Sequence, residues 1–340
     1  MPTLLAWRAT CRPYHRDVAA ELQDSVRTLI APFVPDQKAF LDLIVEKRAL
    51  IIGEAALSYI LRHPSPTVLE LSLGSLVFEE FMTRFRELPG ARENIHTLDR
   101  IHHPPTFLSL RQISKTTVLH LISGATILVH ESASTSPCSA VAGSWTSALM
   151  NFVTPYSFGC AYPRLTLCLR GLICEPRLSA LTQMDYDLVK RMFDSFSLST
   201  SLNHWPPRRN GDNDSEQPHW TLSDGECGKS LYLCLNQSRY FGDGGSLVVF
   251  YDISPATMIY VYARGVAPYG TMVAWRLLAS EICSSGCTCD SIDTLLPQEV
   301  TISLLRLVDA HCIASCKKCG RPPFTYKPSA GTRRTRASTI

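Results

Sequence analysis

The sequence predicts an α+β protein in which helices flank a mixed β-sheet, and three observations carry this prediction. Residues 49–52 are a short apolar run that ends at Gly53 and leads into a helical pattern, as a buried strand followed by a helix does. Residues 68–73 alternate in the manner of a strand. Residues 4–33 repeat apolar side chains at helical spacing. A chain of 340 residues is long enough for about two domains.

The composition is that of an ordinary globular protein. Hydrophobic residues make up 45% and charged residues 19% of the chain, and the net charge is only +3, which gives no sign of nucleic-acid binding. The most apolar segment, residues 117–129, is too short to span a membrane and contains His120. The N-terminus lacks the apolar stretch of a secretory signal. We therefore expect no membrane association and an intracellular location in the cytoplasm or nucleus.

The first two elements are expected to be helices. Residues 4–33 predict a helical leader that is interrupted or started at Pro13 and closed by Pro32, because proline lacks an amide donor and fixes its backbone. A second helix is expected over residues 37–47. The inward face of the leader should carry apolar residues at helical spacing, which are Leu22, Val26, Leu29 and Ile30.

The middle of the chain alternates between both kinds of element. After the strand at residues 49–52, helices are expected over residues 55–61, 76–87, 139–152 and 185–193. Beside the strand at residues 68–73, further strands are expected over residues 107–113, 117–122 and 126–130. The helix at 76–87 should bury an aromatic-rich stripe made of Phe78, Phe81, Met82 and Phe85.

The C-terminal third is expected to be a smaller α/β region. Strands are predicted over residues 231–235 and 246–251, joined by a turn at Gly242–Gly245, and over residues 258–263. Helices are predicted over residues 271–282 and 300–310. The full division is a helical leader at 1–36, a main domain at 37–200, a linker or surface loop at 206–218, a smaller region at 219–316 and a basic, disordered tail at 317–340.

Several motifs in the main domain resemble a fungal nucleotidyltransferase-like family over about residues 38–195. A glycine turn follows a short strand at Gly53, and residues 66–73 take the place of the family's Pro-x-Asp-hydrophobic-Asp strand. A Met-Asn pair at Met150–Phe152 and the sequence Tyr-Pro-Arg-Leu-Thr at residues 162–166 follow in the same order. The resemblance implies a nucleotidyltransferase-like mixed sheet.

The same resemblance implies a two-metal site from which most ligands are missing. Enzymes of this kind hold two divalent ions with carboxylates and bring a triphosphate to a Gly-Ser pair. The two carboxylate positions on the strand fall on Val68 and Glu70, the third falls on Leu128, and Glu54 stands where serine would be. We therefore expect no catalytic residue, with Glu70 as a leftover or structural partner. The alternative is an active enzyme. In that case magnesium would be bound, and Gly53 and Glu70 would contact the nucleotide.

A different alignment of the third metal-ligand position would supply the missing acid. If the alignment is displaced by a few residues, His130 and Glu131 replace Leu128 as the third ligand. An active metal-dependent nucleotidyltransferase that uses Glu70 is thus kept as an alternative.

The N-terminus shows a second resemblance. Residues 4–26 are similar to the latter half of an F-box, the helical module that docks onto an adaptor subunit of ubiquitin ligases. This implies a substrate adaptor with that subunit as its partner. The simpler interpretation is a helical leader that packs on the domain.

The cysteines predict reduced thiols with one candidate metal site. There are 13 cysteines, an odd number, and no export signal accompanies them. Near the C-terminus four of them have spacings that suit zinc, and the alternative is buried thiols. These four are Cys283, Cys287, Cys316 and Cys319.

The leading functional expectation is therefore a non-catalytic nucleotidyltransferase-like protein that acts in protein interaction. No cofactor is expected other than zinc at the four cysteines. The sequence argues against catalytic activity, because a single carboxylate does not hold two magnesium ions.

Overall fold

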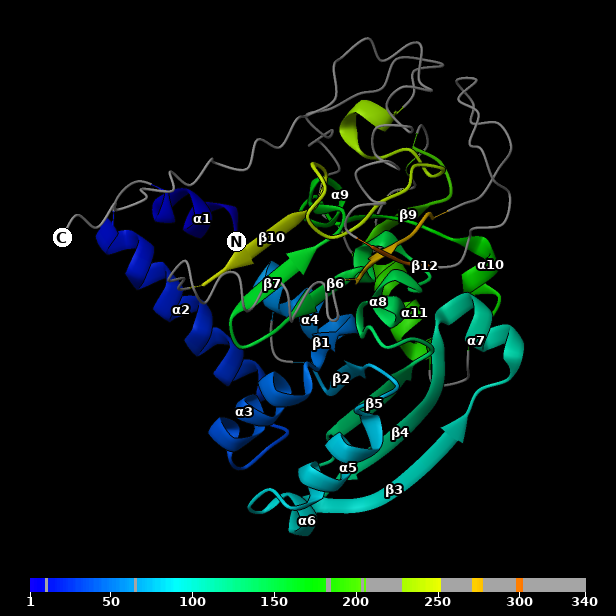
Figure 1. The fold of residues 1–340 in the computed structure, drawn as a ribbon. Helices are drawn as coiled ribbons and strands as arrows, with labels where there is room; N and C mark the ends of the chain where they lie inside the picture. The colour runs from blue at the N-terminus through cyan, green and yellow to red at the C-terminus, as the bar shows by residue number, and fades with distance from the viewer. Residues whose placement is uncertain are drawn as a thin grey trace, which may run out of the picture.

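The computed structural model shows an α+β fold built around one mixed, eight-stranded sheet (Figure 1). The structure describes residues 1–9, 12–63, 66–181, 185–202, 205, 228–251, 271–277 and 298–301. In spatial order, the strands of the sheet are β10 (Leu247–Phe250), β7 (Ser157–Cys160), β6 (Asn151–Val153), β1 (Leu50–Ile52), β2 (Val68–Leu73), β5 (Thr126–Ser132), β4 (Ile113–Leu121) and β3 (Ile95–His102). β2 and β5 run parallel, whereas the other neighbouring pairs are antiparallel.

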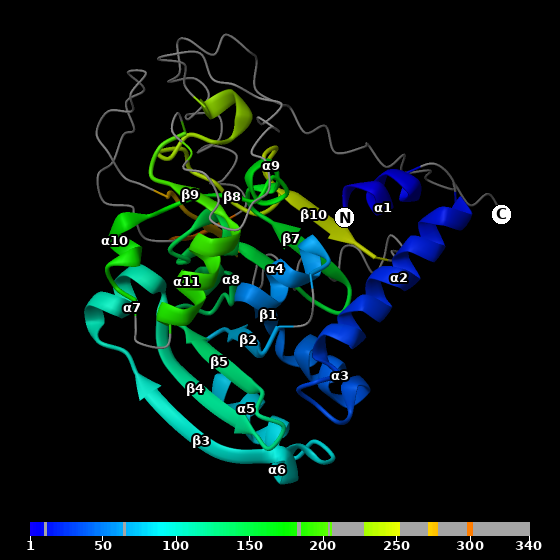
Figure 2. The same ribbon diagram turned by 180° about the vertical axis from the view of Figure 1, so that it is seen from behind.

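The helices lie around this sheet. In Figure 2, α2 and α3 lie to the right of the central strands, and α7, α10 and α11 lie to the left. The α-helices are α1 (Pro2–Arg8), α2 (Arg12–Ile30), α3 (Gln37–Lys47), α4 (Gly53–Leu61), α5 (Phe78–Arg86), α6 (Ala91–Asn94), α7 (Pro105–Arg111), α8 (Cys138–Ala142), α9 (Pro163–Thr166), α10 (Glu175–Leu178) and α11 (Asp185–Ser195). Short 3₁₀ turns cover Ser147–Leu149 and Gly228–Leu231, and two small sheets pair β8 (Arg170–Leu172) with β9 (Ser197–Ser199) and β11 (Thr271–Ala274) with β12 (Gln298–Thr301).

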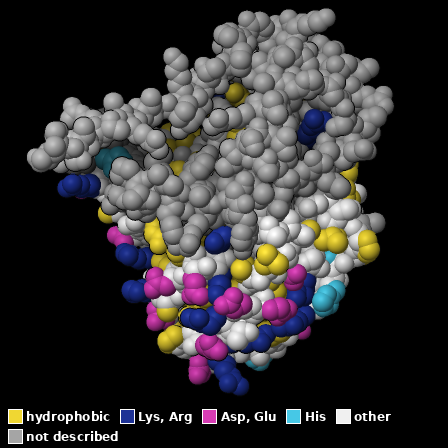
Figure 3. Space-filling view, in the orientation of Figure 1, with side chains coloured by type: hydrophobic (Ala, Val, Ile, Leu, Met, Phe, Trp, Pro, Cys, Tyr) yellow, Lys and Arg dark blue, Asp and Glu magenta, His cyan; other side chains and the backbone are white. Residues whose placement is uncertain are grey.

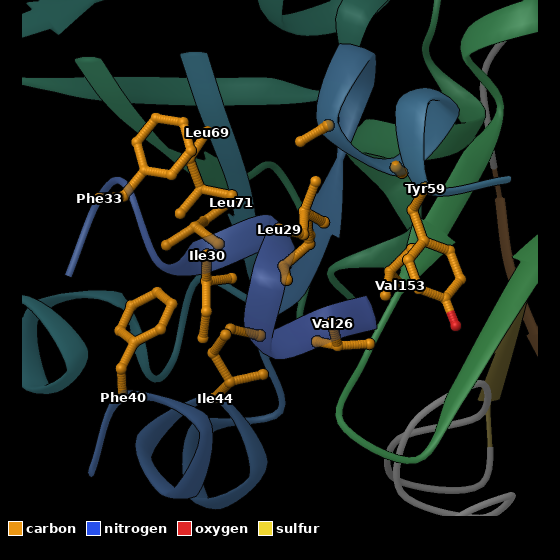
Figure 4. Close-up of a cluster of buried hydrophobic side chains, with 14 of the residues drawn as sticks. Val26, Leu29, Ile30, Phe33, Phe40, Ile44, Tyr59, Leu69, Leu71 and Val153 are labelled. Carbon is orange, nitrogen blue, oxygen red and sulfur yellow. The ribbon is translucent and has the colours of Figure 1, made fainter. Parts of the chain in front are cut away.

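The main core lies between the leader helices and the sheet. Leu69 and Leu71 of β2 point toward Ile30 at the end of α2 and toward Phe33 in the turn that follows (Figure 4). All four side chains are buried, and the aromatic stripe of α5 joins the same cluster. Burial of this apolar surface makes the largest favourable contribution to the free energy of packing α2, α3 and α5 on the sheet.

A second core lies on the other face of the sheet. Leu50 and Ile52 of β1 pack there with Phe152, Phe241 and Trp275, all of them buried. The ring of Phe241 lies 4.8 Å from that of Phe152 and 5.1 Å from that of Trp275. The described residues of the C-terminal third thus pack against the sheet and also supply its edge strand, β10.

Several predicted elements are confirmed. The leader helix is present as α1 and α2, and the predicted helix over residues 37–47 is α3, whose N-terminus is capped by Asp36 through a 2.9 Å bond from the Ala39 amide. The strand over residues 68–73 is β2, and the helix over residues 185–193 is α11. Of the predicted inward residues of the leader, all four are buried.

Two predictions in the middle of the chain are wrong. Residues 107–113 were expected to be a strand but lie in α7 up to Arg111, because Pro105 is well placed at a helix start. The helix predicted over residues 139–152 ends at Ala142, and the chain continues through a 3₁₀ turn into β6. A Cβ on Gly143 would lie 2.3 Å from the carbonyl oxygen of Arg111, so close packing fixes the break at this glycine.

Predictions in the C-terminal third are corrected where the structure describes them. Leu231 ends a 3₁₀ turn and residues 232–235 form no strand, so the glycine turn at 242–245 does not join two strands. The expected helices at 271–282 and 300–310 begin instead in β11 and β12. The strand at 258–263, the linker at 206–218 and the tail at 317–340 lie outside the described residues.

Candidate functional site

The turn from β1 into α4 is built directly against Glu70. Gly53 has a φ of 64°, and a Cβ at this position would lie 2.1 Å from Glu70 Oε1 and 2.6 Å from Oε2. The backbone amide of Glu54 donates to Glu70 Oε1 at 3.4 Å. An anion at a helix N-terminus is stabilised by the helix dipole. The Glu70 carboxylate therefore lies at the N-terminus of α4.

The register of the sheet places on one face the three positions that the resemblance would align with acids. Val68 and Glu70 are two residues apart on β2, so their side chains point to the same face. Leu128 of β5 is the direct partner of Glu70 in the parallel pair. This face thus presents one carboxylate between two aliphatic side chains.

His130 lies beside Glu70, whereas Glu131 does not. His130 Nε2 is 3.6 Å from Glu70 Oε2, and its Nδ1 is 2.9 Å from Thr116 Oγ1. The same hydroxyl is 2.7 Å from Nε2 of His103. Glu131 points to the opposite face, where it pairs with Lys115 at 2.9 Å.

The residues present do not fit a two-magnesium centre. Magnesium prefers several oxygen ligands, and the family positions supply only the carboxylate of Glu70. One of its oxygens faces the Glu54 amide and the other faces His130. In the described part of the chain, no group of three or more His, Cys, Asp or Glu residues is arranged to hold a metal ion.

Glu54 adds a second negative charge at the start of α4. Its carboxylate accepts two hydrogen bonds from Arg191 of α11, at 3.1 Å from Nε and 2.7 Å from Nη2. The pair therefore ties α11 to the α4 N-terminus. A carboxylate at this point repels a phosphate group.

The other motif residues of the resemblance are buried in the fold. Asn151 donates from Nδ2 to the Ala148 carbonyl oxygen at 2.6 Å. The Tyr162 ring lies 4.5 Å from the guanidinium of Arg239, and Thr166 is fully buried. These contacts give the motif residues structural roles.

Sequence reasoning did not place Thr116 or Arg191 at this site, and it interpreted His103 only as part of a histidine pair in a loop. His103 contacts Thr116, Thr116 contacts His130, and Arg191 contacts Glu54. These are tertiary contacts that the local sequence does not indicate. The candidate zinc ligands Cys283, Cys287, Cys316 and Cys319 lie outside the described residues.

The apolar face of the F-box-like segment is buried in the core of the protein. Val18, Leu22 and Val26 of α2 are at most 4% exposed and belong to the main core. The Tyr59 hydroxyl of α4 donates to the Leu22 carbonyl oxygen at 3.0 Å. The leader is therefore an integral layer of the fold.

The face in Figure 3 mixes acidic and basic side chains. Lysine and arginine alternate with aspartate and glutamate over its lower part. The described part of this face therefore mixes both signs of charge and lacks the single-sign field that attracts a polyanion.

The five described cysteines are free thiols with different access to solvent. Cys138, Cys160, Cys174 and Cys234 are buried, and Cys168 is exposed. Burial raises the pKa of Cys160 to about 11, which leaves about one thiol in a thousand ionised at pH 8. We expect iodoacetamide at pH 8 to label Cys168 in the native protein and to leave Cys160 unmodified until urea is added, as peptide mass spectrometry would show. Rapid native labelling of Cys160 would contradict this burial.

Comparisons with known proteins found no relative. No family model, no curated protein and no solved structure matches the chain. Among the described residues, no helix has both the length and the apolar character needed to cross a lipid bilayer.

Proposed function

We propose that this protein is a non-catalytic nucleotidyltransferase-like protein that acts through protein interaction. The observation that carries the proposal is the sheet face formed by Val68, Glu70 and Leu128, where one carboxylate stands in place of three. This carboxylate contacts the α4 N-terminus of the protein itself.

The electrostatics of the α4 N-terminus support the same conclusion. A triphosphate carries several negative charges and would approach Glu54 and Glu70 together. The guanidinium of Arg191, which would favour phosphate, is already paired with Glu54. The burial of the α2 apolar face in the main core supports a structural leader over an adaptor-docking module.

Titration calorimetry of the full chain with ATP and magnesium tests whether the protein binds the nucleotide and metal that catalysis requires. We expect no magnesium-dependent heat from the unmodified protein and the same result from Glu70→Gln. Glu79→Gln is a matched control, because it makes the same chemical change at a carboxylate that pairs with Lys115 on the other face. A magnesium-dependent signal that vanishes in Glu70→Gln and survives in Glu79→Gln would establish an active site and overturn the proposal.

A further inference from the structure

β3 is an edge strand of the eight-stranded sheet. In Figures 1 and 2, β4 lies on one side of it and no labelled helix or strand lies beyond it on the other. Residues 97–102 pair with β4 in one unbroken register, and the irregularity of the pairing lies before them, between Ile95 and Thr97. A bulge, a proline or a lysine commonly blunts an edge strand. Residues 97–102 contain none of these.

The hydrogen bonds of β4 determine which backbone groups of β3 point outward. The amide of His103 donates to the Ser114 carbonyl oxygen at 3.2 Å, and the amide of Leu121 donates to the Ala125 carbonyl oxygen at 2.8 Å. Successive residues of a strand alternate between its two neighbours, so even-numbered residues of β4 face β3 and odd-numbered ones face β5. No backbone hydrogen bond within the described part of the chain engages the outward residues of β3. These are Leu98, Arg100 and His102.

The two faces of this edge carry different charges. Arg100 extends over the α5 face, where its Nη2 lies 3.4 Å from Glu79 Oε2. Asp99 lies on the opposite face, where its Oδ2 is 3.9 Å from Nε2 of His120. The Asp99 side chain is 68% exposed. With most of its surface in solvent, this carboxylate can accept a cation from a strand added beside β3.

The charges of β3 oppose pairing with a second copy of the chain. Opposite residues of an antiparallel pair share a face, so two-fold symmetry places one residue opposite itself. The two registers that pair most of residues 97–102 bring Asp99 opposite Asp99 or Arg100 opposite Arg100. Like charges directly opposite each other destabilise a strand pair. A strand of different sequence avoids this repulsion.

We infer that β3 binds an extended segment of a partner protein as an added antiparallel strand, with a lysine of the partner opposite Asp99. Main-chain hydrogen bonds to the outward groups of Leu98, Arg100 and His102 supply the affinity, and side chains of the added strand set the specificity. Apolar partner residues suit the half-buried Leu98 and Ile101, and a neutral one suits the ion-paired Arg100. The inference deepens the proposed interaction function and rests on it.

Amide hydrogen exchange of the full chain, followed by NMR, tests the inference with the capped peptide Thr-Val-Thr-Lys-Val-Thr. Aligned antiparallel, its first residue lies opposite His102 and its lysine opposite Asp99. At a peptide concentration about ten times the Kd, exchange should slow about tenfold at the outward amides of Leu98, Arg100 and His102. The amides of Asp99 and Ile101 already face β4 and should exchange as before.

Two N-methylated peptides are matched controls, because methylation removes an amide hydrogen and leaves the side chains unchanged. At the residue opposite Arg100, whose amide faces β3, methylation should abolish the slowing. At the lysine, whose amide faces away, it should preserve the slowing. In the protein, Asp99→Lys should weaken binding about fivefold, whereas Asp24→Lys on α2, at a similarly exposed carboxylate, should not change it.

Unchanged exchange at the outward amides, or equal effects of the two N-methylated peptides, would overturn the inference. Slowing of the same amides that grows with protein concentration without peptide would also overturn it, because it would assign this edge to a second copy. The calorimetric test with ATP and magnesium addresses Glu70 rather than β3, so the two proposals fail separately.

Discussion

Replacement of Arg239 by methionine should lower the free energy of unfolding by about 3–5 kcal/mol, because it leaves the buried Asp243 carboxylate without its ion-pair partner. The two side chains are 0% and 2% exposed and share two contacts of 2.5 and 3.0 Å. Arg239 also donates to the Ala161 carbonyl oxygen at 2.8 Å and so joins the segment at 228–251 to the end of β7. Urea unfolding followed by circular dichroism measures the change.

The double variant Arg239→Met with Asp243→Leu is the control for this prediction. Removal of both charges eliminates the unpaired carboxylate, so the double variant should be more stable than Arg239→Met alone. A single variant that costs less than about 1 kcal/mol, the range of an exposed pair, would show that this pair is not buried in solution.

Replacement of Gly53 by alanine should cost about 2–5 kcal/mol. Its φ of 64° is unfavourable for a residue with a Cβ, by about 1–2 kcal/mol. The new Cβ would also lie 2.1 Å from the Glu70 carboxylate, and such overpacking costs about 1–3 kcal/mol. The shift of the urea midpoint in the full chain gives the value.

Gly124 supplies the matched control for the Gly53 prediction. It has a φ of 83°, but a Cβ there would meet nothing within 4 Å, so Gly124→Ala isolates the backbone strain. Gly53→Ala should cost clearly more than Gly124→Ala, and the excess should shrink when Glu70 is also changed to alanine. Equal costs at the two glycines would mean that Glu70 does not lie against the turn.

The parts of the fold that could be predicted are those fixed by local sequence. The α3 helix has a capping Asp36 at its start, and β2 alternates cleanly. The small apolar residues after Ser139 suit a helix or a buried turn equally well. The close approach of Gly143 to the Arg111 carbonyl, 32 residues earlier in number but adjacent in space, decides between them. Such a contact has no local signal.

Only those features of the candidate site that depend on local sequence could be predicted. Alternation along β2 places Val68 and Glu70 on one face, and this follows from the sequence alone. The position of Leu128 beside Glu70 depends on the pairing of β2 with β5. The contact between Arg191 and Glu54 joins residues 137 positions apart. Tertiary structure therefore had to supply the partners of both carboxylates.

The hydroxyl of Thr116 links the hydrogen-bonding roles of two imidazole rings. Nitrogen atoms of His103 and His130 both lie within hydrogen-bond distance of its oxygen. A hydroxyl owns a single hydrogen, so at most one of these nitrogens accepts from it and the other ring must donate. When His103 Nε2 accepts the hydroxyl hydrogen, Nδ1 of His130 must donate to the same oxygen, and Nε2 of a neutral His130 then faces Glu70 across 3.6 Å without a hydrogen. In that arrangement the hydrogen-bonding role of the outer ring decides what the acid faces without any movement of the backbone.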